Sequence, residues 1–200
     1  NAEFVGPLAP ATAPTTQALP AAVTDSGRTV VVVSQGTVDN DDPEKLIAPT
    51  LDALANCSNV VVATTGGKNT AELRARYTSP NVVIEDFLPF DTLFAQADVF
   101  VTNGGFGSTL AAFRHGVPVV TAGTREGKND LNARTSYNRL GVDLRTERPK
   151  PAAIARAVHD VLAAADIAAN VERLRAELDS YHPIDTIERA ITATSTAGSG

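Results

Sequence analysis

The feature that most constrains the fold is an alternation of short apolar runs with helical segments. Runs rich in β-branched residues predict six strands, at residues 29–34, 60–64, 82–85, 98–102, 118–121 and 142–144. Helical patterns lie between them: one begins at Asp42-Pro43, and others cover residues 69–77, 91–97, 106–115 and 129–139. This spacing predicts parallel βαβ units with right-handed crossovers. We therefore expect an α/β fold, a doubly wound, Rossmann-like, six-stranded parallel sheet with helices on both faces.

The segments on either side of this core differ from it in composition. Prolines recur among alanines and threonines between residues 6 and 27, which predicts an extended connector. From about residue 151 the pattern is wholly helical, and it ends in a Ser, Thr, Gly and Ala tail. The predicted division is an interdomain linker and entry segment over residues 1–27, a folded domain over 28–194 and a flexible tail over 195–200. Since the chain contains no methionine, we expect it to be a fragment of a longer protein.

Composition narrows the kinds of partner. A hydrophobic content of 43% with 20% charged residues suits one globular domain. The formal net charge of -6 argues against nucleic acid and anionic membranes as partners. Cys57 is the single cysteine and cannot form an internal disulfide, and no apolar run approaches the roughly 18 residues needed to cross a membrane. We expect no nucleic-acid partner, no transmembrane segment and a cytoplasmic location.

The loops after the predicted strands are where a ligand should bind in such a sheet. The most informative loop follows the fourth strand and opens a helix near Phe106, whose first turn offers free N–H groups and the positive end of the helix dipole. Glycines there remove side chains that would keep an anion away, and two hydroxyls follow them. The residues of this predicted phosphate site are Asn103, Gly104, Gly105, Phe106, Gly107, Ser108 and Thr109.

Two further loops extend the site. A small polar turn follows the first strand, and Ser34, Gly36 and Thr37 in it can offer hydroxyl and N–H groups to a phosphate. The loop after the third strand is apolar and aromatic, with Phe87 and Leu88 at its start. Phosphate donors from two loops and an aromatic platform from a third predict a site for a nucleoside diphosphate.

These loops, in this order, resemble the C-terminal, donor-binding half of GT-B glycosyltransferases of the UDP-glycosyltransferase type (family 1). Residues 34–37 are similar to the family's turn near the donor diphosphate, and residues 103–109 resemble its His-x-Gly-x-Gly/Asn-Ser/Thr phosphate motif. Residues 87–90 stand at the place of a Trp-Val-Pro-Gln motif. The resemblance implies that Phe87 stacks on the nucleotide base and that the main chain of Leu88 bonds the base edge.

The chain departs from the family pattern at three places. Asn103 replaces a histidine that contacts a donor phosphate, and Ala111 replaces a glutamate that holds the ribose hydroxyls. The Asp-Gln pair that grips the transferred sugar is replaced by Lys128-Asn129, in a loop similar to that of some bacterial and fungal enzymes. The resemblance implies donor-sugar contacts by residues of this loop, namely Glu126, Lys128, Asn129 and Asp130.

The function implied is transfer of a sugar from a UDP- or dTDP-sugar to an acceptor hydroxyl, with inversion and without a metal or other cofactor. The family's catalytic base lies in the N-terminal, acceptor-binding half, so we expect no catalytic residue here and an inactive isolated chain. No metal site is predicted, and the run Asp39-Asn40-Asp41-Asp42 is interpreted as helix capping. Two alternatives stay open: a non-catalytic nucleotide-binding module and a nucleotide-sugar 2-epimerase. A nicotinamide-binding Rossmann domain is a weaker third, because Ser-Gln-Gly-Thr and not Gly-x-Gly-x-x-Gly follows the first strand.

Overall fold

The chain folds around one all-parallel sheet, as the alternating pattern predicts. The computed structural model describes residues 4–8, 17–25 and 27–197. The strand order is β3-β2-β1-β4-β5-β6, which confirms the doubly wound, six-stranded prediction. The strands are β1 (Val30–Ser34), β2 (Val60–Thr64), β3 (Val82–Glu85), β4 (Val99–Thr102), β5 (Val119–Thr121) and β6 (Gly141–Asp143).

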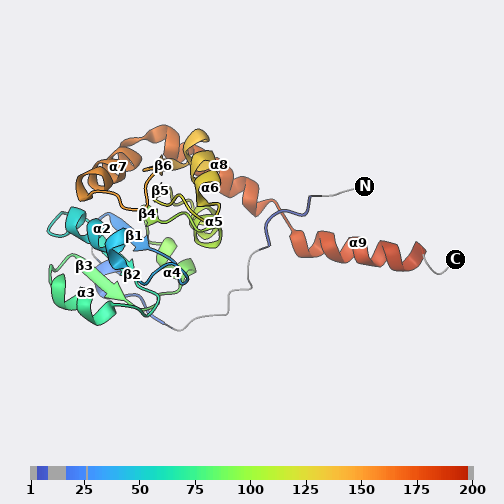
Figure 1. Cartoon of the computed structure of the whole chain (residues 1–200). Helices are drawn as coiled ribbons and strands as arrows, with labels where there is room; N and C mark the ends of the chain where they lie inside the picture. The colour runs from blue at the N-terminus through green and yellow to red at the C-terminus, as the bar shows by residue number, and fades with distance from the viewer. Residues whose placement is uncertain (1–3, 9–16, 26, 198–200) are drawn as a thin grey trace.

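Helices connect the strands and cover both faces of the sheet (Figure 1). The predicted start at Asp42-Pro43 is confirmed, because the Asp42 carboxylate accepts a hydrogen bond from the Glu44 N–H at 3.0 Å. The turn that it caps is a 3-10 helix, however, and α2 proper begins at Ile47. The helical segments are α1 (Ala21–Thr24), η1 (Pro43–Lys45), α2 (Ile47–Leu54), α3 (Thr70–Arg76), α4 (Phe90–Phe94), α5 (Phe106–Arg114), α6 (Lys128–Tyr137), α7 (Pro151–Ala163), α8 (Ala165–Asp179) and α9 (Pro183–Ala197).

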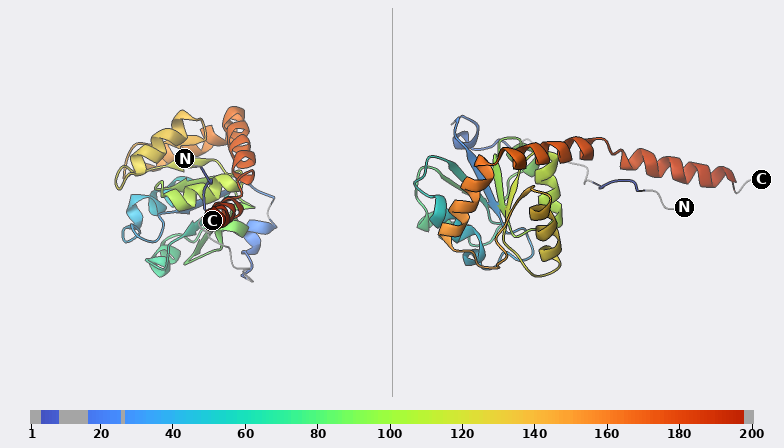
Figure 2. Two further views of the ribbon diagram at one scale, coloured as in Figure 1. Left: turned by 90° about the vertical axis from the view of Figure 1, so that its right-hand side faces the viewer. Right: turned by 90° about the horizontal axis from the view of Figure 1, so that it is seen from above.

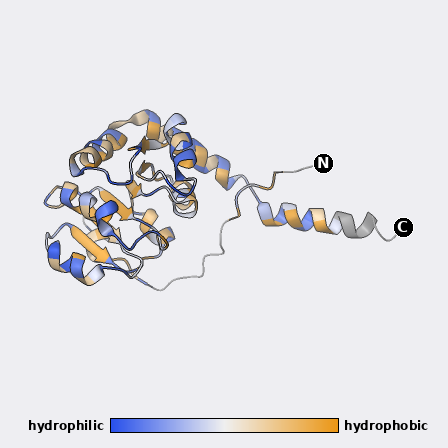
Figure 3. Cartoon of the chain, in the orientation of Figure 1, coloured by the Kyte–Doolittle hydropathy of each residue, from blue (hydrophilic) through white to orange (hydrophobic). Residues whose placement is uncertain are grey.

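The core is built on the three central strands. Every residue of β1, β2 and β4 is buried, and Val32 of β1 lies between Val62 of β2 and Phe100 of β4. Figure 3 shows these apolar strands enclosed by helices of mixed polarity. α2 packs against α7, and α5 packs against α8, so apolar helix faces cover the sheet from two sides. This burial explains why the strands are valine runs without a polar face.

Strand order reverses beside β1, and that reversal positions the site. The chain leaves β1 toward β2 and β3, then returns to place β4 on the other side of β1. Connections from β1 and from β4 therefore diverge at the carboxyl edge of the sheet. A crevice between diverging loops at this edge is where ligands bind in doubly wound folds.

The flanking segments differ from expectation in two ways. The prediction of an extended connector is wrong over α1, a helical turn whose Val23 is buried against the core, while residues 9–16 lie outside the described residues. Residues 195–197, predicted to be tail, belong to α9, and residues 198–200 are not described. α9 projects away from the body of the domain, with residues 4–8 running near its base (Figure 2). In the described ranges no helix is long and apolar enough to span a bilayer.

Candidate functional site

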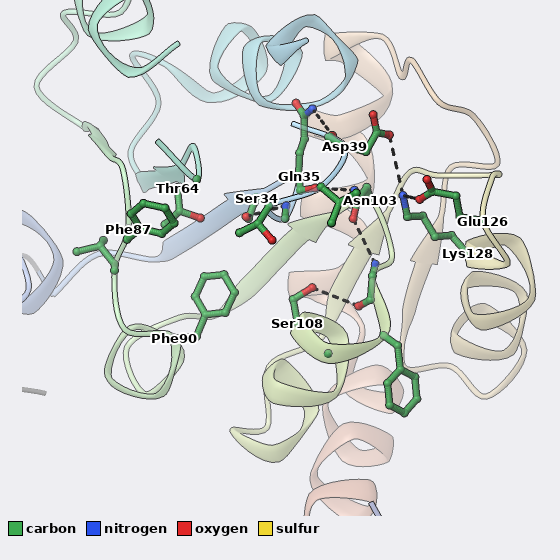
Figure 4. A pocket seen from close by; sticks show the side chains of 18 of the residues that line it. Ser34, Gln35, Asp39, Thr64, Phe87, Phe90, Asn103, Ser108, Glu126 and Lys128 are labelled. Carbon is green, nitrogen blue, oxygen red and sulfur yellow. Dashed lines mark hydrogen bonds and ion pairs between the residues drawn. The ribbon is translucent and has the colours of Figure 1, made fainter. Parts of the chain in front are cut away.

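A cavity of about 710 Å³ opens at the carboxyl ends of the strands. Its walls come from the loops after β1, β2, β3, β4 and β5, which meet at the topological switch point (Figure 4). The volume lies within the roughly 300–1,000 Å³ of pockets that enclose small molecules. The four loops to which the sequence assigns ligand contacts, those after β1, β3, β4 and β5, all reach this one cavity.

The first turn of α5 forms one wall and presents free donors. α5 has Gly105 at its N-cap and no side-chain cap, and its first internal bond runs from the Thr109 N–H to the Gly105 carbonyl at 3.1 Å. Phe106, Gly107 and Ser108 line the cavity, and within the described chain their N–H groups have no hydrogen-bond partner. Such an uncapped helix start attracts anions through its N–H groups and its dipole.

The glycines of this loop have different roles. A Cβ at Gly107 would meet nothing within 4 Å, so this residue leaves the cavity open beside the helix start. Gly104 does not line the cavity: it has φ +84°, and a Cβ there would overlap the buried side chain of Asn132 in α6. Gly104 therefore allows a close approach of the backbone to α6, and its expected place beside a phosphate stays a prediction.

Thr109 also lies outside the cavity lining. Its side chain is 1% exposed, and it comes after the three residues of α5 that face the cavity. The helical rotation between Ser108 and Thr109 turns the threonine hydroxyl into the protein interior. Of the two hydroxyls predicted to face a phosphate, only that of Ser108 reaches the wall.

Asn103 joins the two predicted phosphate loops. Its Nδ2 donates to the main-chain carbonyl of Gln35 at 2.6 Å, and its Oδ1 accepts from the Gly105 N–H at 3.2 Å. The amide therefore ties the loop after β1 to the loop after β4. Ser34 is similarly engaged, since its Oγ accepts from the Gly36 N–H at 3.2 Å. Gly36 and Thr37 line the cavity beside them.

Gln35 organises the loop after β1 and was not predicted as a site residue. It is 2% exposed, and its Oε1 accepts hydrogen bonds from the N–H groups of Leu46 and Ile47 at 3.2 and 3.0 Å. Its Nε2 donates to the carbonyls of Asp39 and Asp42 at 3.3 and 3.0 Å. No sequence pattern predicts this role of Gln35, because its four hydrogen-bond partners lie in turns that come together only in the folded chain.

The aromatic end of the cavity lies at the loop after β3. Phe87 is 59% exposed and lines the cavity, whereas Leu88 is 8% exposed. The main-chain groups of Leu88 make no hydrogen bond to the described residues, so they are free for a ligand. Phe90 also lines the cavity, but its ring packs on those of Phe94 and Phe100 in the core, at centroid distances of 4.8 and 6.0 Å.

A buried hydroxyl at this end has no protein partner. Thr64 ends β2, is 4% exposed and lines the cavity. Its Oγ1 is buried without a hydrogen bond among the described residues. A buried hydroxyl left unpaired costs free energy, so a polar group of a ligand could satisfy it. Thr64, like Asp39 and Asp86 in the lining, was not among the predicted site residues.

The loop after β5 contributes charged side chains. Glu126 and Lys128 line the cavity and form an ion pair of 2.8 Å, and the Lys128 ammonium lies 4.0 Å from an Asp39 carboxylate oxygen. Asn129 and Asp130 are exposed and do not line the cavity, because the first turn of α6 carries them away from it. The four predicted donor-sugar residues are thus divided, with two at the cavity and two outside.

Glu147 holds the start of this loop. One of its carboxylate oxygens accepts from the Thr124 N–H, from the Thr124 hydroxyl at 2.9 Å and from the Arg125 N–H at 3.0 Å. Partial burial alone would raise the pKa of Glu147, but these hydrogen bonds outweigh it, and the pKa is lowered. Glu147 is a positioning residue for the segment that leads to Glu126 and Lys128.

The acidic run after β1 is used within the protein. Asp39 pairs with Lys45, Asp41 pairs with Lys68, and Asp42 caps η1. Helix capping is therefore confirmed for Asp42, while Asp39 and Asp41 form ion pairs instead. Over residues 4–8, 17–25 and 27–197, no three His, Cys, Asp or Glu side chains group in a way that could hold a metal ion.

Substitution of the two loop glycines should separate packing from ligand access. Gly104→Ala should lower the free energy of unfolding by about 2–3 kcal/mol, because it combines a positive φ with a steric overlap. Gly107→Ala should leave stability unchanged or raise it by up to about 1 kcal/mol, since the new methyl meets open space in a helix. Urea unfolding of both variants checks this, and equal destabilisation would contradict the assignment.

Removal of the Glu147 charge should change how stability depends on pH. The lowered pKa means that the ionised Glu147 stabilises the fold above its ordinary pKa of 4.5, and that this contribution disappears as the pH falls through the folded-state value. Glu147→Gln should therefore be less stable than the unsubstituted chain at pH 7, with the difference shrinking toward pH 3. Thermal unfolding across this range is the measurement, and a difference independent of pH would refute it.

Comparison with known proteins agrees with this geometry. Residues 48–191 match the family described as the C-terminal domain of erythromycin biosynthesis protein CIII-like proteins. The chain is 41% identical over 167 residues to 4'-demethylrebeccamycin synthase of Lentzea aerocolonigenes, covering 84% of this chain and 38% of that protein. It is 36% identical over 168 residues to UDP-glycosyltransferase 2 of Phaeomoniella chlamydospora, covering 81% and 37%.

The fold is likewise that of a known structure. The calicheamicin glycosyltransferase CalG4 superposes with a TM-score of 0.78 at 26% identity, over 88% of this chain and 46% of that one. The chain thus spans less than half the length of each of these three relatives. Its family match includes the cavity loops after β2, β3, β4 and β5. The chain belongs to the EryCIII-like family of C-terminal domains, and its relatives are UDP-glycosyltransferase-type proteins with the GT-B fold.

Proposed function

We propose that the cavity binds the nucleoside diphosphate of a UDP- or dTDP-sugar, and that the protein transfers this sugar to an acceptor hydroxyl. The observation that carries the proposal is the uncapped start of α5, where three residues with free N–H groups line a cavity that has an exposed aromatic ring at its other end. The diphosphate would lie on α5, and the base would stack on Phe87. The main-chain groups of Leu88 would bond the base edge.

In this proposal the chain acts on the leaving group. As the bond between the sugar and the diphosphate breaks, negative charge grows on the departing phosphate, and fixed N–H donors at a helix start stabilise such charge. No histidine lines the cavity within the described chain. The base that takes the acceptor proton would come from the acceptor-binding half, and the transfer would invert the sugar without a metal.

The segments outside the globular body suggest where that other half docks. Gly6 lies against the ring of Tyr181, which a Cβ would approach within 2.5 Å, so the entry segment runs beside the start of α9. Large apolar side chains of these two segments are strongly exposed: Phe4, Leu8, Ile184 and Ile191. Exposed apolar side chains of this size favour a protein partner, and we propose that the N-terminal half covers them.

One observation favours a non-catalytic alternative. Asn103 stands at the position of the family histidine that contacts a donor phosphate. Both its Nδ2 and its Oδ1 already make hydrogen bonds to the loops after β1 and β4. A module that binds nucleotide but has lost transfer activity would keep the same α5 donors. Activity of the full-length protein, measured with a nucleotide-sugar donor, separates the two possibilities.

Nucleotide binding tests the proposal directly. Calorimetric titration should show UDP or dTDP binding to the chain. Gly107→Val should abolish it, because the branched side chain would fill the space beside the α5 donors. Phe87→Ala should weaken it by about 1–3 kcal/mol if a base stacks on the ring. Exposed Tyr137→Ala, which lies outside the cavity lining, serves as the control for loss of an aromatic ring. Preference for NAD over all nucleoside diphosphates would refute the proposal.

Activity assays test whether this chain binds the donor while the acceptor-binding half supplies the catalytic base. The 200-residue chain alone should release no sugar to an acceptor and hydrolyse no nucleotide sugar faster than buffer does, although it binds the donor. Full-length protein should be active, and Ile184→Glu with Ile191→Glu should reduce activity through loss of docking while leaving UDP affinity of the isolated chain unchanged. Transfer by the isolated chain would contradict this assignment.

A further inference from the structure

Lys128 has the only cationic side chain in the lining of the cavity, over the part of the chain that the structure describes. The lining also contains three carboxylates, from Asp39, Asp86 and Glu126. A nucleoside diphosphate brings further negative charge, which the α5 dipole, equivalent to roughly half a positive charge, balances only in part. A ligand of this kind therefore needs a cation from the protein, and Lys128 is the candidate in place.

The two side chains of the Lys128–Glu126 ion pair differ strongly in their exposure to solvent. The Lys128 side chain is 12% exposed, whereas that of Glu126 is 60% exposed. Asp39, the second acid near Lys128, already pairs with Lys45. Ion pairs with an exposed partner contribute little, so Glu126 can leave Lys128 for solvent at small cost. The Lys128 ammonium therefore lies at the cavity, and a ligand can replace Glu126 as its ion-pair partner.

The position of Lys128 on α6 is unfavourable for the helix itself. Lys128 is the first residue of α6, where the helix dipole favours acidic side chains and disfavours cations. Gly127 supplies the N-cap with φ +77° and no side-chain hydrogen bond, so the Lys128 charge at this end is offset by Glu126 and by Asp130 in the first turn, and both of these acids are exposed. A half-buried cation at the positive end of a helix stabilises the protein poorly, which favours a role in binding.

The order of strands places Lys128 at one end of the cavity. Phe87 follows β3, α5 follows β4, and Lys128 follows β5, so the cavity runs from the aromatic ring past the α5 donors to the ammonium. Figure 4 shows Phe87 and Lys128 on opposite sides of Ser34 and Asn103. A nucleotide whose base stacks on Phe87 would extend its distal phosphate, the one that carries the sugar, toward Lys128.

We propose that Lys128 binds the distal phosphate of the donor by exchanging its ion pair with Glu126 for one with that phosphate. This inference rests on the proposed function and deepens it. An ammonium donates hydrogen bonds and accepts none, so Lys128 acts on the phosphate oxygens rather than as an acceptor for sugar hydroxyls. The released Glu126 carboxylate then becomes available to accept a hydroxyl of the sugar.

The test compares ligands that differ in the distal phosphate. By calorimetry, Lys128→Gln should weaken UDP about ten- to hundredfold, as expected for loss of a charged hydrogen bond, and leave UMP within about twofold. Lys128→Arg should restore most of the UDP affinity. Glu126→Gln should tighten UDP binding, and this gain should shrink when combined with Lys128→Gln. Lys150→Gln, which removes the same charge from an exposed position outside the cavity, should change neither affinity.

Thermal stability of the Lys128→Gln variant distinguishes a ligand-binding role of Lys128 from a role in stabilising the fold. Thermal unfolding of Lys128→Gln should occur at the same or a higher temperature, because the substitution removes a cation from the start of α6. Equal weakening of UDP and UMP, or an effect on UDP-sugar with none on UDP, would overturn the inference while leaving the proposed function intact. Failure of the unsubstituted chain to bind either UDP or dTDP would refute the proposed function, and the inference with it.

Discussion

Pairing of β1 with β4 is the constraint on which the rest of the structure depends. It sets Val32 beside Phe100 in the centre of the core and sends the connections from these two strands apart. Because both strands are parallel and buried, their carboxyl ends open at one edge, and the loops there cannot fill the gap between them. The Asn103 hydrogen bonds to Gln35 and Gly105 then hold the two loops at a fixed separation.

The side-chain charges of the cavity lining have the same sign as the net charge of the whole chain. The formal net charge is -6, and carboxylates outnumber ammonium groups in the lining. Charges on the far surface are screened by salt over roughly 10 Å, whereas N–H groups at hydrogen-bond distance act without such loss. Among the described residues of the lining, the uncapped start of α5 and the Lys128 side chain are the groups that favour an anion.

Much of the architecture was predictable because it depends on local pattern. Runs of valine and other apolar residues predicted β1, β2 and β4, and the glycine-rich loop predicted the start of α5 at Phe106. The predictions from sequence were wrong where packing between distant segments outweighs the local preference that composition indicates. Val23 turns a proline-flanked segment into a helical turn because the core offers a place for it. Gln35 and Thr64 became visible only in three dimensions, since their significance lies in burial and in partners distant along the chain.

The number and type of elements, the parallel sheet and the loops that carry the site follow from the sequence alone, since hydrophobic periodicity and glycine positions are local properties of a chain. Tertiary structure decided which side chains of those loops face the cavity. Gly104 and Thr109 point into the protein, Asn103 joins two loops, and Lys128 lies inside the cavity while its neighbours in α6 do not. The direction of each side chain depends on helix rotation and on the approach of α6, which are set by packing between elements far apart in sequence.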